Sequence, residues 1–67
     1  MALYHFSYMA VWDTIVEADN VTDAIELAEA KAPSCIELEG EPYVTNKDTG
    51  KNGYYSVLEE YEENKEN

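Results

Sequence analysis

The alternation of side chains in the first eighteen residues predicts a pair of β-strands. Residues 2–12 contain no glycine, proline, lysine or acidic residue. Alternate positions place a mostly aromatic set on one side of this run: Tyr4, Phe6, Tyr8, Ala10 and Trp12. The other side is also largely apolar, which is typical of a central strand. Asp13 and Thr14 are expected to turn the chain into a second strand over residues 14–18.

A helix is predicted over residues 20–32. Asn20 is a good N-cap, and Asp23 stands three residues later in the capping-box position, near the positive end of the helix dipole. Apolar residues recur at spacings of three and four: Val21, Ala24, Ile25, Ala28 and Ala32. This spacing is typical of a helix with one buried face. Pro33 should end the helix, because the residue before a proline avoids helical dihedral angles.

Two further strands are expected after the helix. Apolar residues alternate with acidic ones in the pattern of a half-buried third strand over residues 36–45, which Gly40 and Pro42 interrupt as a bulge at a sheet edge. A turn-rich stretch then leads to a fourth strand over residues 54–58. Residues 60–67 are expected to form a frayed helix or a mobile, solvated tail.

These elements give the order ββαββ in a single domain, residues 1–67. We expect an α+β fold in which a four-stranded antiparallel sheet carries one helix across one face. Because one helix covers only one face of a sheet, the opposite face should expose part of the first strand and some tyrosines. Such rings either complete a small core or provide a contact surface, since tyrosine and tryptophan are enriched at binding hot spots.

The composition adds a strong negative charge to this picture. Fifteen acidic residues stand against four basic ones, which gives a formal net charge of -11 and a pI near 4.1. Hydrophobic residues make up 45% of the chain and aromatic residues 12%, whereas disordered acidic tails contain few aromatics. A folded surface with this charge repels nucleic acids and anionic membranes and attracts basic clefts, most of which hold DNA or RNA.

No catalytic signature is present, and we expect the protein not to be an enzyme. Cys35 is the only cysteine and His5 the only histidine, which excludes an intrachain disulfide and a zinc site built from Cys and His ligands. No pattern brings the two together as a nucleophile and its base. Cys35 is expected to pack as a small hydrophobic residue, and His5 to be an ordinary strand residue. The chain start lacks the basic region of a signal peptide, and no apolar run approaches the length of a membrane span. These features predict a cytoplasmic protein without a cofactor.

One stretch, residues 48–59, resembles the 12-residue calcium loop of EF-hand proteins. The resemblance implies calcium ligands at four positions: Asp48, Asn52, Ser56 and Glu59. Gly53 matches the turn glycine of that loop, but Gly50 stands where the family has an acidic or amide ligand, and residues 42–45 predict a strand instead of the entering helix. A β-hairpin is the competing interpretation, because glycine and asparagine supply its turn. A calcium-binding module is therefore kept as an alternative.

Acidic residues form two rows on the predicted elements. The rows are Glu37, Glu39 and Glu41 on the third strand, and Asp23, Glu26 and Glu29 on the helix. Alternate residues of a strand are about 6.6 to 6.8 Å apart, which is of the same order as successive phosphates on one nucleic-acid strand. We expect the two rows to bind a basic partner protein, with exposed Tyr43 and Tyr54 as anchors. A charge that serves only solubility is the alternative.

In size, charge and element order, the chain resembles the small acidic inhibitors that phages encode, which include anti-CRISPR and DNA-mimic proteins. No motif is shared, so the resemblance assigns no residue a role. It implies a non-enzymatic inhibitor in the cytoplasm of a bacterial host cell, which occupies a basic nucleic-acid-binding surface of another protein and binds neither nucleic acid nor membrane itself. A small structural or oligomerising domain, such as a homodimer, is left open beside it.

Overall fold

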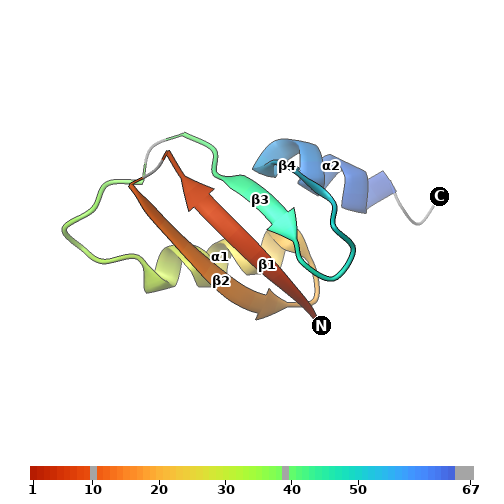
Figure 1. Cartoon of the computed structure of the whole chain (residues 1–67), viewed down its shortest axis with the longest axis horizontal. Helices are drawn as coiled ribbons and strands as arrows, with labels where there is room; N and C mark the ends of the chain where they lie inside the picture. The colour runs from red at the N-terminus through yellow and green to blue at the C-terminus, as the bar shows by residue number, and fades with distance from the viewer. Residues whose placement is uncertain (10, 39, 65–67) are drawn as a thin grey trace.

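Four strands and two helices follow one another in the order ββαββα in the computed structural model, which describes residues 1–9, 11–38 and 40–64. The elements are β1 (Ala2–Tyr8), β2 (Trp12–Ala18), α1 (Val21–Lys31), β3 (Tyr43–Asn46), β4 (Asn52–Tyr54) and α2 (Tyr55–Asn64). All neighbouring strands are antiparallel, and the sheet order is β2-β1-β3-β4 (Figure 1). The predicted α+β class and the antiparallel four-stranded sheet are confirmed, and α2 is an additional helix.

An aromatic row on β1 organises the first hairpin. Tyr4, Phe6 and Tyr8 are buried, as the alternating pattern predicts. Their partners on β2 complete the same face, with Tyr4 opposite Val16 and Tyr8 opposite Trp12. β1 has β2 on one side and β3 on the other, so its predicted central position is confirmed.

The turn of this hairpin lies earlier than the sequence pattern indicates. β1 ends at Tyr8, and Met9 has a φ of 48°, a left-handed conformation that is found mainly in turns. Trp12 begins β2, and its ring centre lies 5.9 Å from that of Tyr8. The turn predicted at Asp13 and Thr14 is wrong, because both residues pair with β1. Matching two large rings across the ladder keeps both strands in register on the buried face.

The start and the end of α1 agree with the sequence signals. The Asp23 backbone N–H donates to Asn20 Oδ1 at 2.8 Å, which satisfies one of the amide groups that a helix N-terminus leaves free. Ala24 and Ala28 are buried on the side that packs against the sheet. The helix stops before Pro33, as predicted.

The predicted third strand is only partly formed. β3 begins after Pro42, and the described residues within 32–42 form turns and irregular backbone. Pro42 cannot donate to a ladder, and Gly40 has a φ of 74°, so this stretch is poorly suited to a strand. The third strand expected over residues 36–45 is therefore wrong for residues 36–38 and 40–42, and it is confirmed over residues 43–45. Glu39 lies outside the described residues.

α2 replaces the predicted fourth strand. β4 ends at Tyr54, and the strand expected to continue to Leu58 is wrong. Tyr55, Leu58 and Glu62 are buried or half-buried and recur at spacings of three and four, which is the helical period. An apolar run as short as 54–58 fits the strand and helix periods equally well, so the pattern alone did not decide between them.

The segment before β3 caps the start of α2. The Ser56 N–H donates to Glu41 Oε1 at 2.7 Å, and the Tyr55 N–H donates to the Pro42 carbonyl at 3.0 Å. These contacts satisfy amide groups that the helix N-terminus would otherwise leave free. The hydrogen bonds from Ser56 hold the pKa of Glu41 below its usual value.

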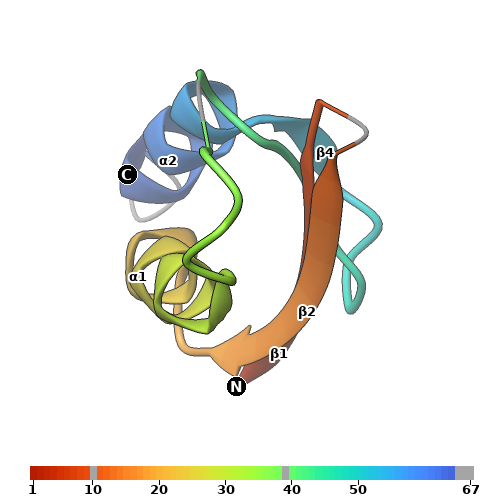
Figure 2. The ribbon, with the colours of Figure 1, turned by 90° about the vertical axis from the view of Figure 1, so that its left-hand side faces the viewer.

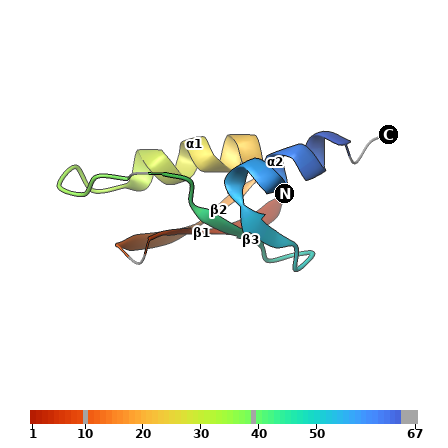
Figure 3. The same cartoon turned by 90° about the horizontal axis from the view of Figure 1, so that it is seen from above.

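Both helices lie on one face of the sheet, and the other face is open (Figure 2, Figure 3). The core between the two layers consists of Tyr4, Phe6, Tyr8, Val16, Ala18, Val21, Ala24, Ala28, Val44 and Leu58. The open face exposes Leu3 of β1 together with Tyr43 and Tyr54, so the predicted exposure of part of the first strand and of some tyrosines is confirmed. Over the described residues, neither helix combines the length and the apolar character needed to cross a membrane.

Candidate functional site

The outer side of α1 carries three exposed carboxylates. Burial of Ala24 and Ala28 fixes the rotation of the helix about its axis, so Asp23, Glu26 and Glu29 face solvent. The acidic row predicted on the helix is thus brought together by the fold.

α2 adds carboxylates to the same layer of the molecule. The two helices contain three and four acidic residues, and Lys31 is the basic residue among their described positions. Lys31 Nζ donates to the Ile15 carbonyl at 3.1 Å, so this cation is held toward β2 instead of among the acids. We define the acidic helix layer as the exposed acids of the two helices, namely Asp23, Glu26, Glu29, Glu60 and Glu63.

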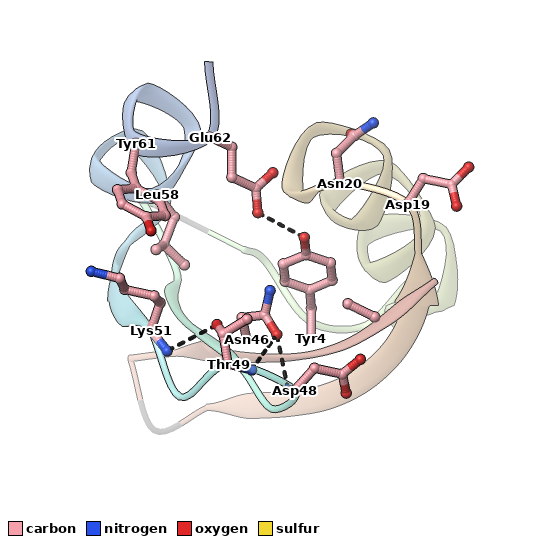
Figure 4. A pocket seen from close by; sticks show the side chains of 11 residues that line it. Tyr4, Asp19, Asn20, Asn46, Asp48, Thr49, Lys51, Leu58, Tyr61 and Glu62 are labelled. Carbon is pink, nitrogen blue, oxygen red and sulfur yellow. Dashed lines mark hydrogen bonds between the residues drawn. The ribbon is translucent and has the colours of Figure 1, made fainter. Parts of the chain in front are cut away.

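Glu62 has a different role, because it ties both helices to the sheet. Its Oε1 accepts from the Val21 N–H at 2.8 Å. Its Oε2 accepts from the Tyr4 hydroxyl at 2.7 Å, as drawn in Figure 4. The first bond caps α1 and places a negative charge at the positive end of the helix dipole. Residues 60–64, expected to form a frayed helix or a mobile tail, belong to α2 in the structure, and residues 65–67 lie outside the described part of the chain.

An open cleft of about 620 Å³ lies beside this contact (Figure 4). Its walls come from the start of β1, the turn before α1, the β3–β4 turn and α2. Lys51 Nζ lies 4.4 Å from the centre of the Tyr61 ring, a cation–π contact, and both residues line the cleft with Asp48 and Glu62. The chain therefore supplies its own ammonium group to this acidic cleft.

Among the residues that the structure describes, no group of three or more His, Cys, Asp or Glu side chains could hold a metal ion. His5 Nε2 lies 3.0 Å from Asp13 Oδ2 on the sheet. Cys35 is exposed on the loop between α1 and β3, so its predicted packing as a small buried residue is wrong. The thiol of Cys35 is therefore exposed to solvent.

The residues of the EF-hand-like stretch are spread over separate contacts. Asp48 lies in the β3–β4 turn and lines the cleft, whereas Asn52 Oδ1 accepts from the Tyr43 hydroxyl at 2.7 Å. Ser56 lies in the first turn of α2, and Glu59 accepts from a tyrosine of the same helix. This segment forms the turn and second strand of the β-hairpin of the competing interpretation, followed directly by a helix, and Asn52 and Glu59 have separate side-chain partners.

Tyr43 and Tyr54 pair on the open face of the sheet. Their ring centres are 5.5 Å apart with planes at 84°, the edge-to-face arrangement that aromatic quadrupoles favour. Their exposed fractions are 43% and 57%. The two predicted aromatic anchors are therefore together, but they lie on the side of the molecule opposite the acidic helix layer.

The acidic row predicted on the third strand does not exist as an array. Glu37 is exposed on irregular backbone, and Glu41 is engaged at the N-terminus of α2. Glu39 lies outside the described residues. Without a strand, nothing holds these carboxylates at the regular spacing on which the prediction depended.

Two buried tyrosines make the fold sensitive to alkaline pH. Burial and the hydrogen bond to Glu62 raise the pKa of Tyr4 well above its usual value, and burial with the charge of Glu29 raises the pKa of Tyr8 to about 12. In the unfolded chain, both groups ionise near pH 10. Because the pKa values are higher in the folded state, the neutral tyrosines stabilise the fold, and their contribution is complete below pH 10. It is lost above pH 10 at about 1.4 kcal/mol per pH unit for each tyrosine.

We expect the urea midpoint of unfolding to fall steeply between about pH 10 and pH 12, and Tyr8→Phe to flatten that fall. Within the described part of the chain, the Tyr8 hydroxyl has no hydrogen-bond partner. The substitution should therefore be neutral or stabilising at pH 7, because it removes an unsatisfied polar group. Urea titrations followed by circular dichroism across this pH range measure both effects. An unchanged pH profile in the variant would contradict the assignment.

Sequence reasoning identified the acids of α1 but missed the contributions of α2, whose Glu60 and Glu63 complete the acidic helix layer. The signal that could have found them is the helical spacing of Tyr55, Leu58 and Glu62. No protein-family model, curated protein or solved structure matches this chain.

Proposed function

We propose that the protein is a non-enzymatic inhibitor that binds, through its acidic helix layer, a basic nucleic-acid-binding surface of a partner protein. The observation that carries this proposal is the set of exposed carboxylates on two adjacent helices, whose lysine is bonded to the edge of the sheet. A surface of one sign accelerates encounter with an oppositely charged surface and selects against anionic partners.

The spacing of the charges supports imitation of a nucleic acid. Asp23, Glu26 and Glu29 follow one another at intervals of three residues, which is a rise of about 4.5 Å along the helix axis. Phosphates on one strand of duplex DNA rise by about 3.4 Å each along the axis of the duplex. The rise between successive acids of α1 is of the same order. Because helices hold these positions before binding, less conformational freedom is lost than with acids on a loop.

The same reasoning favours the helices over the segment from which the sequence predicted binding. Glu41 already accepts a hydrogen bond from the α2 backbone, and Glu37 stands on irregular backbone. Tyr43 and Tyr54 lie on the open face, so one flat partner surface could not contact them and the acidic helix layer together. The proposal therefore assigns recognition of the basic partner to α1 and α2.

The test is competition with DNA for captured proteins. The protein is immobilised, exposed to a bacterial extract and eluted at constant ionic strength with a 20-base-pair duplex. Polyglutamate at equal charge concentration serves as the control. We expect the duplex to release nucleic-acid-binding proteins that polyglutamate leaves bound, because the duplex and the protein compete for one shaped surface. Equal release by the two polyanions would contradict the proposal, because charge alone, without a shaped surface, would then account for the binding.

A further inference from the structure

β2 is a free edge of the sheet, and no strand lies beyond it in the described part of the chain (Figure 1). The direction of its backbone groups follows from the neighbouring ladder. The Leu3 carbonyl accepts from the Lys47 N–H at 2.8 Å, on the β3 side of β1. The backbone N–H and C=O of a strand residue point to the same side in an antiparallel ladder, so both groups of Leu3 face β3. Leu3 stands opposite Glu17 on β2, and this pair therefore exchanges no hydrogen bonds. The N–H and C=O of Glu17 consequently point away from β1.

Hydrogen-bonded and non-hydrogen-bonded pairs alternate along the ladder, so the backbone groups of Asp13 and Ile15 also point outward. An independent contact agrees with this assignment, because the Ile15 carbonyl accepts from Lys31 Nζ at 3.1 Å, from outside the sheet. Asp13, Ile15 and Glu17 therefore each present one N–H and one C=O along the edge of a strand seven residues long. Such an edge is a template for an added strand.

Side-chain charge restricts what can be added. Asp13, Ile15 and Glu17 are all exposed on the open face, and Asp13 contacts His5 through Oδ2. A strand paired antiparallel to β2 would place one residue directly opposite each of them, with Cα atoms about 5.5 Å apart. Opposite charges at such positions stabilise a sheet, and like charges destabilise it.

A second copy of the chain is a poor occupant. In the antiparallel register that pairs the whole of both β2 strands, Asp13 of each copy stands opposite Glu17 of the other. Each copy also carries a formal net charge of -11. Like charges therefore meet at both ends of the contact, in addition to the repulsion between the whole molecules.

We propose that the β2 edge binds an extended segment of a partner protein by strand addition. Basic side chains of that segment would lie opposite Asp13 and Glu17, and an apolar one opposite Ile15. Main-chain hydrogen bonds then supply affinity, and the alternate side chains supply specificity. Lys31 occupies the Ile15 carbonyl in the free protein and is displaced by the incoming N–H. This surface is separate from the acidic helix layer, so the two proposals can fail independently.

A synthetic peptide tests the edge directly. The probe is a capped heptapeptide of threonines with lysine at its second and sixth positions and valine at its fourth, titrated into the ¹⁵N-labelled protein and followed by NMR. N-methylation of the valine amide removes the donor to the Ile15 carbonyl and should weaken binding about tenfold. N-methylation of the third residue modifies an amide that faces away and should change affinity by less than about twofold. Equal losses from the two methylations, no binding of the unmodified peptide, or tighter binding of the version with glutamate in place of lysine would overturn the proposal.

Variants of the protein provide the matching test. Ile15→Pro removes the outward N–H without removing a bond to β1, a position where edge strands tolerate proline, and should weaken peptide binding about tenfold. Ile15→Thr keeps that N–H and should bind the peptide nearly as well as the unmodified protein. Lys31→Met should tighten binding severalfold, because it frees the carbonyl and removes a like charge. Neutralising Glu26, Glu29 and Glu60 should leave peptide binding unchanged. Self-association in sedimentation experiments that Ile15→Pro abolishes would overturn the proposal in favour of a second copy.

Discussion

Replacing Glu62 by alanine is expected to lower the free energy of unfolding by about 2 kcal/mol and Tm by about 10 °C. The substitution removes the acceptor of both the Val21 N–H and the Tyr4 hydroxyl. Tyr4 is only 2% exposed, so the substitution leaves a largely buried hydroxyl without its acceptor. The contact also joins the last turns of α2 to the start of α1, which extends the effect to the packing of both helices. Thermal and urea unfolding followed by circular dichroism measure the loss.

Glu63→Ala is the matched control for this substitution. It removes the same charge from the next residue of the same helix, but Glu63 is exposed, and its replacement should change stability by no more than about 0.5 kcal/mol. In a Tyr4→Phe background, Glu62→Ala should cost less, because one of its two bonds is already absent. Equal effects from the two alanine substitutions would show that α2 is not held by this contact.

The parts of the fold that the sequence predicted are those decided by local signals. The aromatic side of β1 follows from side-chain alternation, and the start of α1 follows from the Asn20 cap. Pro33 stops the helix through its own stereochemistry. In each case the cause lies within a few residues of the effect, so the chain can be interpreted without knowledge of the tertiary structure.

Local signals indicate α2 only in part, through the helical spacing of Tyr55, Leu58 and Glu62, because contacts from distant residues also decide its state. The run 54–58 suits a strand or a helix, and its first amides are satisfied by Glu41 and Pro42, more than ten residues earlier. The anchor at Glu62 joins α2 to residues of β1 and α1. The composition does not indicate which of the fifteen acids makes a partly buried contact such as that of Glu62. The acidic sequence of α2 also resembles that of a solvated tail.

Only part of the candidate site could be predicted, because some of its residues depend on local periodicity and others on tertiary contacts. The acids of α1 follow from helical periodicity, but the row expected at residues 36–41 depended on a strand. In the structure the third strand, β3, begins only after Pro42, so the described acids of this stretch lie outside the sheet. The exposure of Tyr43 and Tyr54 could be predicted, whereas their position opposite the acidic helix layer depends on both helices packing on the same face.

Neutralising three acids of the helix layer is expected to weaken binding of the basic partner about 100-fold. The variant combines Glu26→Gln, Glu29→Gln and Glu60→Gln, which preserve side-chain size and helix propensity. Three close charge pairs, each worth about 1 kcal/mol, together account for a change of this size. The dependence of affinity on salt should also become shallower, since fewer ion pairs form in the complex. Calorimetry with the partner released by duplex DNA gives both quantities.

The most direct test of the proposed role of α1 and α2 compares this variant with a second one of equal net charge. The second variant carries Asp19→Asn, Glu37→Gln and Asp48→Asn, which are exposed positions outside the helices. The measurement is the dissociation constant of each variant for the same partner at the same ionic strength. A binding surface on the helices predicts about 100-fold weakening for the helix variant and less than about threefold for the other. Equal weakening of the two would contradict it, because the charge would then act without a defined surface.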